Sequence, residues 1–325
     1  MDSLLTVDDL RVSFHLLDGH ICAVDGVSFH LKQGEILSVL GESGCGKSVT
    51  ALSIMGLVPP PGKINNGCID FNGMELLSLS EQDMNRIRGN EISMIFQEPM
   101  TSLNPVFKVG NQISEAIKLH QGVSLAEATD KTIEMLKEVD IPSPERNYHQ
   151  YPHQLSGGMR QRVMIAMALC CNPKLLIADE PTTALDVTIQ AQILTLLQTA
   201  QQERDMSILL ITHDLGVIAE IADRVIVMYA GMIVEEAESE FLFDKPLHPY
   251  TKGLLESRPS IGEKRDELSV IEGTVPHPSR FPEGCRFHPR CPFAKEICRQ
   301  KNPRTFQPIP GRKARCWLFG DEVNG

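Results

Sequence analysis

The sequence predicts an α/β fold with an antiparallel β portion, a helical insertion and a small C-terminal domain rich in cysteine and proline. Three observations lead to this prediction. Short apolar runs typical of buried strands alternate with helical patterns, a glycine-rich loop joins one strand to the next helix, and proline becomes dense after about residue 256. We therefore expect one domain over residues 1–256, with the helical insertion at about 98–157, and a C-terminal extension over 257–325.

The individual elements follow from local patterns of apolar residues. Alternating or continuous apolar runs predict strands at Leu5–Val7, Leu10–Phe14, Val24–Leu31, Glu35–Leu40, Ile92–Phe96, Leu175–Ala178, Ser207–Thr212, Val225–Tyr229 and Met232–Glu235. Helical patterns follow the glycine-rich loop and cover Arg160–Ala168 and Ile189–Gln201. No internal repeat interrupts this order.

Composition narrows the class of protein. The 325 residues are 42% hydrophobic and 22% charged, as in ordinary globular domains, and the net charge of −11 argues against a nucleic-acid partner. No apolar run approaches the roughly 18 residues of a membrane span, and the N-terminus lacks the basic and apolar regions of a signal peptide. We therefore expect a cytoplasmic protein whose membrane role, if any, comes through a partner.

The glycine-rich loop carries the most specific motif. Residues 41–48 match the pattern G-x4-G-K-[ST] between a predicted strand and a predicted helix. Its glycines let backbone N–H groups surround phosphates, Lys47 reaches the β- and γ-phosphates, and Ser48 binds Mg²⁺. The alternative is a plain glycine-rich turn, which the flanking strand and helix disfavour. The expected nucleotide-binding residues here are Gly41, Ser43, Gly44, Cys45, Gly46, Lys47, Ser48 and Val49.

Two carboxylates follow the apolar run at residues 175–178. Asp179 is placed to hold Mg²⁺, and Glu180 is placed to polarise an attacking water as a general base. Taken alone, such a pair is more often a helix cap or a solvated loop. Together with the phosphate-binding loop, it predicts a hydrolytic site for ATP.

Further polar residues follow other predicted strands. His213 comes after Ser207–Thr212, where it can contact the γ-phosphate, and Gln97 follows Ile92–Phe96. Ligands bind at the carboxyl edge of open α/β sheets, so we expect these side chains to lie there. The segment Ser156-Gly157-Gly158 opens a predicted helix and forms a second anion cradle. Because one ATP does not need two cradles, this segment is expected to bind the ATP of a second subunit.

The order of these motifs resembles the ATPase of ABC transporters, a P-loop NTPase, over about residues 4–256. The resemblance implies a head-to-tail dimer that sandwiches ATP and Mg²⁺ between the loop of one subunit and residues 156–158 of the other. It also implies that Phe14 stacks on adenine, that Asp186 lies in a dimer-contacting loop, and that Gln97 links Mg²⁺ to the coupling surface at Gln97–Pro105. Met159 stands where this family commonly has Gln.

Other phrases resemble the oligopeptide/dipeptide permease subfamily, in particular its D-type ATPase. These phrases are Gln97–Pro105, Tyr151–Gln154, Asp186–Gln190 and His248–Thr251. The resemblance implies two polytopic membrane permease subunits, a second homologous ATPase and an extracytoplasmic substrate-binding protein, with this chain peripheral at the cytoplasmic face of the membrane. Peptides are the leading substrate, and nickel, metal-chelating opines and glutathione are the alternatives.

Four of the nine cysteines gather in the proline-rich tail, at Cys285, Cys291, Cys298 and Cys316. Four thiolates can ligate an iron–sulfur cluster or a structural Zn²⁺. The spacings lack the C-x2-C pairs usual in zinc ribbons, so they favour [4Fe–4S], as does the resemblance to peptide-permease ATPases. Free thiols in a tail packed by prolines are the remaining alternative.

The sequence disfavours three other protein classes. A soluble ABC ATPase of DNA repair would carry a long coiled-coil insertion or a basic face, and a translation-associated ABC protein would carry two cassettes. A P-loop kinase would lack the segment Leu155–Gly158. Interspersed acidic residues indicate that Arg86, Arg88 and Arg146 face solvent rather than forming a basic patch.

Overall fold

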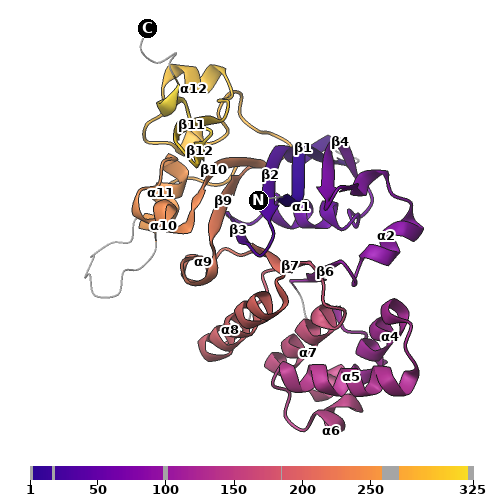
Figure 1. Ribbon diagram of the computed structural model, residues 1–325. Helices are drawn as coiled ribbons and strands as arrows, with labels where there is room; N and C mark the ends of the chain where they lie inside the picture. Colours follow the sequence, from indigo (N-terminus) through magenta and orange to yellow (C-terminus); the bar gives the residue numbers. More distant parts are fainter. Residues whose placement is uncertain (1–2, 17–18, 98–101, 184, 258–270, 321–325) are drawn as a thin grey trace. The chain divides into compact units, whose positions relative to one another are not determined.

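The computed structural model describes residues 3–16, 19–97, 102–183, 185–257 and 271–320. The chain divides into two compact units that interleave along the sequence (Figure 1). Unit 1 contains Leu31–Glu35 and Ser78–Ile211. Unit 2 contains Ser3–His30, Ile36–Leu77 and Thr212–Gly325. The predicted division at residues 256 and 257 falls within unit 2, directly before a segment outside the described residues.

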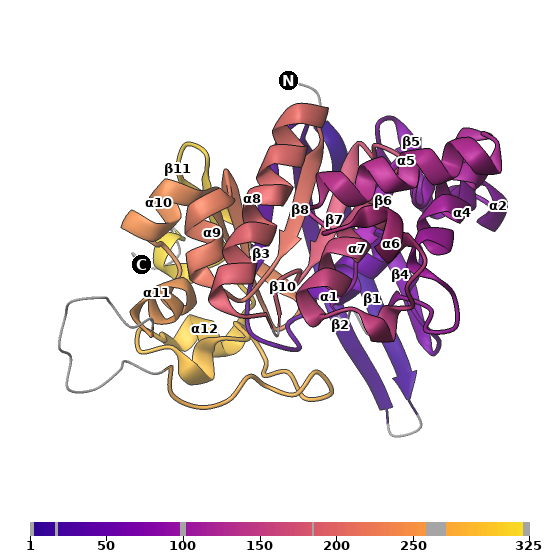
Figure 2. The ribbon, with the colours of Figure 1, turned by 90° about the horizontal axis from the view of Figure 1, so that it is seen from below.

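Unit 2 contains an antiparallel sheet in the order β2-β1-β4-β5. Its strands are β1 (Ser3–Leu16), β2 (Gly19–Lys32), β4 (Gly62–Phe71) and β5 (Met74–Glu75). Figure 2 shows the long ribbon that β1 and β2 form. The sequence predicts two strands here, but the structure has the single strand β1. A bulge at Asp9, with φ of 42°, interrupts the alternation of buried residues, so that Leu5 and Val7 are buried before it and Leu10 and Val12 after it.

Unit 2 also contains the strand that leads into the glycine-rich loop. This strand, β3 (Ile36–Leu40), pairs in parallel with β9 (Arg224–Tyr229), and β9 pairs antiparallel with β10 (Met232–Glu238). The C-terminal extension continues this sheet, since β12 (Arg312–Ala314) pairs with β10 and β11 (Phe306–Ile309) pairs with β12. The helices of unit 2 are α1 (Lys47–Ile54), α9 (Leu215–Ile221), α10 (Ser239–Asp244), α11 (Pro249–Glu256) and α12 (Glu296–Gln300).

Aromatic side chains bring the extension into the core of unit 2. The rings of Tyr229 and Tyr250 lie 4.6 Å apart between centroids, and Phe287 lies 5.2 Å from Tyr229 and 5.4 Å from Tyr250. All three side chains are buried. Residues 285–291 therefore pack as part of the unit and not as a separate tail.

Unit 1 contains three parallel strands, β6 (Ile92–Ile95), β7 (Leu175–Asp179) and β8 (Ser207–Ile211), with β7 in the middle. Every residue of these strands is buried, which explains their continuous apolar sequences. The helices, purple to rose in Figure 1, are α2 (Glu81–Ile87), α4 (Val109–Gln121), α5 (Leu125–Glu138), α6 (Pro144–Tyr148), α7 (Gly157–Leu169) and α8 (Val187–Arg204).

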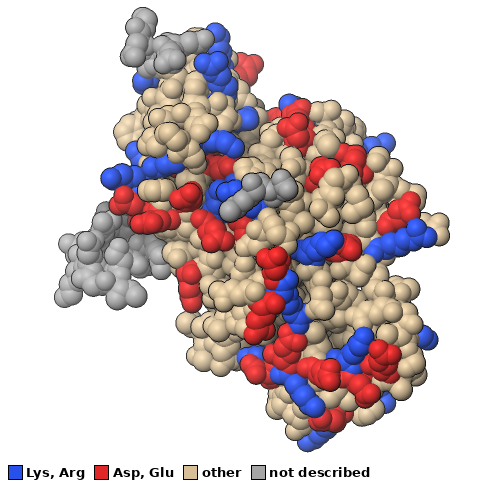
Figure 3. Space-filling view, viewed as in Figure 1, with Lys and Arg blue, Asp and Glu red and all other residues tan. Residues whose placement is uncertain are grey.

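The predicted α/β fold with an antiparallel portion is confirmed. Apart from the two predicted strands that merge into β1, each predicted strand and helix appears within a few residues of its expected bounds. Sequence patterns missed β4, whose centre reads Asn65-Asn66-Gly67, residues typical of turns. They also missed the short elements after residue 270. Of the helices described, none combines the length and the apolarity needed to cross a bilayer. Figure 3 shows acidic and basic side chains interspersed on the face in view.

The buried histidine of α11 predicts a pH-dependent stability. His248 is fully buried, its Nδ1 accepts a hydrogen bond from the Tyr250 N–H at 3.0 Å, and burial lowers its pKa from 6.5 to about 3. The unfolded chain therefore binds a proton below pH 6.5 that the folded chain does not bind. Stability should fall on acidification by up to about 1.4 kcal/mol per pH unit.

His248→Asn keeps a side-chain acceptor for the helix cap and removes the titration. In denaturant unfolding between about pH 7 and pH 5, the variant should lose less stability than the wild type. Equal pH dependence in both proteins would contradict this assignment.

Candidate nucleotide-binding site

The loop at residues 41–48 closes tightly against neighbouring backbone in unit 2. A Cβ on Gly41 would lie 2.4 Å from the carbonyl oxygen of Met228 and 2.6 Å from the sulfur of Cys45. Gly46 has φ of 103°, and a Cβ there would lie 2.5 Å from the carbonyl oxygen of Ala23. Both glycines are therefore required by the path of the backbone, and not only by the phosphates expected at the loop.

Lys47 lies inside this loop. Its Nζ donates to the carbonyl oxygens of Gly41, at 2.7 Å, and of Glu42, at 3.2 Å, and the residue is 6% exposed. Ser48 and Val49 are half-buried in the first turn of α1, whose N-cap is Gly46, while Ser43 and Gly44 are exposed. The loop thus combines an ammonium group, a helix N-terminus and exposed backbone, which is the arrangement that binds phosphate.

His213 lies at the same edge of unit 2 as the loop. The N–H of Thr212 donates to the carbonyl oxygen of Val39, next to the end of β3 from which the loop starts. His213 follows Thr212 and is exposed, and its predicted contact with the γ-phosphate stays a prediction. Phe14 is half-buried in β1 opposite Gly62. Its predicted contact with adenine stays a prediction.

Glu180 is held in place by its neighbours in unit 1. Gln97 Nε2 donates to its Oε2 at 3.0 Å, and Thr183 Oγ1 donates to the same oxygen at 2.9 Å. The Glu180 N–H donates to the Ile211 carbonyl oxygen at 2.8 Å, and its φ is 50°, a conformation uncommon for Glu. The structure therefore brings Gln97 and Glu180 together, beside buried Asp179.

The second predicted anion cradle opens α7. Ser156 is its N-cap and accepts a hydrogen bond from the Met159 N–H at 3.3 Å. Gly157 is exposed, and nothing lies within 4 Å of a Cβ placed there, whereas at Gly158 such a Cβ would lie 3.2 Å from Ile189 of α8. Ser156 and Gly157 are exposed to a ligand from outside the unit.

Asp186 is the N-cap of α8 in unit 1. Its Oδ1 accepts a hydrogen bond from the Ile189 N–H at 2.9 Å. Its predicted place at a dimer interface stays a prediction, as do the roles of the other predicted site residues. The neighbouring Ala184 lies outside the described residues, and so do Glu98–Thr101 of the predicted coupling segment.

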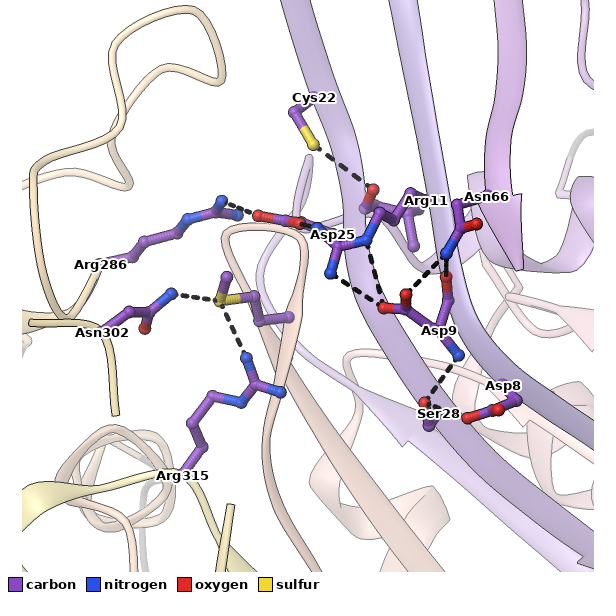
Figure 4. Close-up of polar contacts among 12 residues, drawn as sticks. Asp8, Asp9, Arg11, Cys22, Asp25, Ser28, Asn66, Arg286, Asn302 and Arg315 are labelled. Atoms are coloured by element: carbon purple, nitrogen blue, oxygen red, sulfur yellow. Dashed lines mark hydrogen bonds and ion pairs between the residues drawn. The ribbon is translucent and has the colours of Figure 1, made fainter. Parts of the chain in front are cut away.

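Three residues that contact or support the loop were missed by sequence reasoning. The hydroxyl of Tyr250 accepts a hydrogen bond from the Glu42 N–H at 3.1 Å. Arg290 forms an ion pair with the Glu42 carboxylate at 2.8 Å. Arg286 pairs with Asp25 (Figure 4). It also donates to the Ala230 carbonyl oxygen at 2.5 Å. In the sequence, only the segment His248–Thr251 pointed to one of these residues, Tyr250. It did so as a resemblance to a subfamily and did not predict a contact with the loop.

The four tail cysteines lie near one another in unit 2. The Cys285 N–H donates to the Cys298 carbonyl oxygen at 2.8 Å. Burial, together with the negative charges of neighbouring tail cysteines, raises the pKa of Cys285 to about 11 and that of Cys316 to about 12. Within the described residues, however, no group of three or more His, Cys, Asp or Glu side chains is arranged to hold a metal ion.

Comparison with known proteins identifies the family. The profile of the ABC transporter family matches residues 24–183, and that of the oligopeptide/dipeptide transporter C-terminal region matches residues 234–298. A solved dimer of the ATP-binding cassette MJ0796, bound to ADP and Pi, is 28% identical with a TM-score of 0.65. The match covers 72% of this chain and 98% of that chain.

Two curated relatives match along almost their whole length. Oligopeptide transport ATP-binding protein AppD of Bacillus subtilis is 54% identical over 323 residues, which are 99% of this chain and 98% of the relative. Dipeptide transport ATP-binding protein DppD of Haemophilus influenzae is 51% identical over 314 residues, 97% of this chain and 95% of the relative. The chain therefore belongs to the ABC transporter family, as one of its ATP-binding subunits, and is an ATPase.

Proposed function

We propose that this ATPase powers an importer of dipeptides or oligopeptides. The observation that carries the proposal is the match of residues 234–298 to the oligopeptide/dipeptide transporter C-terminal region, together with two full-length relatives named for peptide transport. These relatives are named for different peptide lengths at similar identity, so the proposal covers both. Import of nickel, opine–metal complexes or glutathione by the same ATPase is the alternative.

The proposal includes the assembly in which this subunit works. It binds at the cytoplasmic face of the membrane to two polytopic permease subunits, beside a second, homologous ATPase, and an extracytoplasmic protein delivers the substrate. The dimer of the cassette MJ0796 supports pairing of two cassettes. In such a pair, Ser156 and Gly157, exposed at the start of α7, contact the nucleotide held by the other subunit.

Within one subunit, the described contacts suggest a division of roles. Lys47 and the loop backbone would hold the phosphates, and Ser48 and Asp179 would hold Mg²⁺, which would neutralise charge on the phosphates. Glu180 orients the attacking water and accepts its proton, while Gln97 and Thr183 fix the carboxylate. His213 contacts the γ-phosphate.

The role of Glu180 predicts a separation of binding from turnover. Glu180→Gln keeps the size of the side chain and removes the basic oxygen, so ATP hydrolysis should fall by about 10²–10⁴-fold while ATP binding persists. Lys47→Ala is the matched comparison, because it should weaken ATP binding itself. Both are measured by phosphate release and equilibrium ATP binding. Normal hydrolysis by Glu180→Gln would remove Glu180 from this role.

The substrate class predicts which ligand stimulates the complex. The assembly is purified from membranes with this chain as bait, its subunits are identified by mass spectrometry, and it is reconstituted with its binding protein. Peptide-loaded binding protein should raise ATP hydrolysis severalfold over the empty binding protein. Stimulation by glutathione, nickel or a metal–opine complex, with none by peptides, would replace the proposed substrate.

We also propose that Cys285, Cys291, Cys298 and Cys316 bind a [4Fe–4S] cluster. Their number, their spacing and their mutual influence on pKa support the proposal. The described arrangement does not itself hold a metal ion, so binding requires the thiols to approach one another. A structural Zn²⁺ at the same thiols is the alternative.

Anaerobic purification tests the cluster directly. The full-length protein should be brown, absorb visible light and contain iron and sulfide, and Cys316→Ser should lose most of both. Cys68→Ser, at an exposed cysteine outside the tail, is the control and should retain them. A colourless wild-type protein that contains zinc, or no metal, would overturn the proposal.

A further inference from the structure

A carboxylate stands in the loop that binds a triphosphate. Glu42 occupies a position that the G-x4-G-K-[ST] pattern leaves open, and its carbonyl oxygen accepts the Lys47 ammonium at 3.2 Å. Negative charge near the phosphates opposes nucleotide binding, because like charges repel strongly over a few ångströms. The loop therefore needs something that offsets the charge of Glu42.

Arg290 of the C-terminal extension contacts this carboxylate with both terminal nitrogens. Nη1 lies 2.8 Å from Oε2, and Nη2 lies 3.3 Å from Oε1. This two-point geometry is the strong form of an Arg–carboxylate pair. The Arg290 side chain is 5% exposed and that of Glu42 is 31% exposed, so the arginine shields one side of the carboxylate from water.

Other contacts fix the guanidinium in this position. Arg290 Nε donates to the Glu272 carbonyl oxygen at 3.1 Å, and Nη2 donates to the Ile271 carbonyl oxygen at 3.3 Å. The guanidinium carbon lies 5.8 Å from the centroid of the Tyr229 ring. These contacts order the buried Arg290 side chain before nucleotide binds. Its side chain therefore loses no further conformational entropy when nucleotide binds.

The charge of Glu42 reaches the interior of the loop. Burial raises the pKa of the Cys45 thiol, the nearby Lys47 lowers it, and the negative charge of Glu42 raises it. Cys45 lies at the base of the loop and is fully buried. The negative charge of Glu42 therefore acts on a buried group inside the loop.

We propose that Arg290 is a positioning residue for ATP, which neutralises Glu42 and turns its carboxylate away from the phosphates. The C-terminal extension would then be part of the nucleotide site and not only an attachment to the ATPase. This inference rests on ATP binding at the loop and is independent of the transported substrate.

Arg286 provides a comparison within the same extension. It pairs with Asp25, which also pairs with Arg11 at 2.6 Å (Figure 4). It also donates to the Ala230 carbonyl oxygen, next to Gly231, whose N–H bonds the Cys45 carbonyl oxygen at 3.0 Å. Arg286 thus supports the loop through the backbone of Ala230 and Gly231 and not through Glu42. Its removal should not be offset by any change at Glu42.

The test is a double-mutant cycle on the full-length chain, read by equilibrium binding of the non-hydrolysable analogue AMP-PNP with Mg²⁺. Arg290→Ala should weaken binding by about tenfold, because it leaves an unpaired carboxylate beside the phosphates. In the Glu42→Gln background, Arg290→Ala should change affinity by less than about twofold, because no carboxylate remains to be neutralised. The defect of Arg290→Ala should also shrink at high ionic strength.

The controls separate charge from folding. Arg290→Gln keeps a long side chain with donors and should show the same rescue by Glu42→Gln, which keeps the test valid if the alanine variant unfolds. Arg286→Ala should not be rescued by Glu42→Gln, and exposed Arg299→Ala should bind normally. Unchanged affinity in Arg290→Ala and Arg290→Gln, or a loss that neither Glu42→Gln nor salt reduces, would overturn the proposal.

Discussion

The close approach of the phosphate loop to its neighbouring backbone is the constraint on which the site depends. Gly41 lies against the Met228 carbonyl group of β9 and Gly46 against that of Ala23 in β2, at distances that no side chain could enter. The loop is therefore closed by strands far from it in sequence before any ligand binds. This closure keeps Lys47 bonded within the loop and starts α1 at its end. Catalysis by charge stabilisation needs donors that are already in place, and the backbone supplies them here.

The C-terminal part of the chain, from α11 onward, also contacts and supports this loop. Tyr250 accepts the Glu42 N–H, Arg290 pairs with its carboxylate, and Arg286 supports the turn that holds Cys45. Tyr250 lies in α11, whereas Arg286 and Arg290 belong to the C-terminal extension, a segment that could be mistaken for a tail because it is rich in proline and its helices are short. Its aromatic contacts with Tyr229 bury it in unit 2, and the strands β11 and β12 extend the sheet. Changes in this segment are thus expected to reach the nucleotide.

In unit 1, the carboxylate of Glu180 is positioned by an unusual backbone conformation and by neighbouring side chains. Glu180 has a positive φ, which costs a residue with a Cβ roughly 1 kcal/mol or more and persists only where surrounding contacts require it. Here the Ile211 carbonyl oxygen holds the backbone, and Gln97 and Thr183 hold the side chain. This backbone conformation turns the carboxylate away from the buried strand that precedes it. A site for a reacting water needs such orientation more than it needs local stability.

The sequence alone determined the features that local residues impose. The strands β3, β6, β7 and β8 are buried because their sequences are continuous apolar runs, and glycines at fixed spacing form the loop. The fold class could therefore be predicted, as could the expectation that polar residues follow these strands at one edge of the sheet. Tertiary structure alone decided which distant groups complete the loop. Arg290 and Glu42 are 248 residues apart, and Glu42 occupies a position that the motif leaves open. No periodicity or spacing encodes an ion pair between two such residues, because it forms only after the intervening strands and aromatic core have packed. The β4 strand was missed for a similar reason, since pairing with β1 overrides the turn preference of its asparagines and glycine.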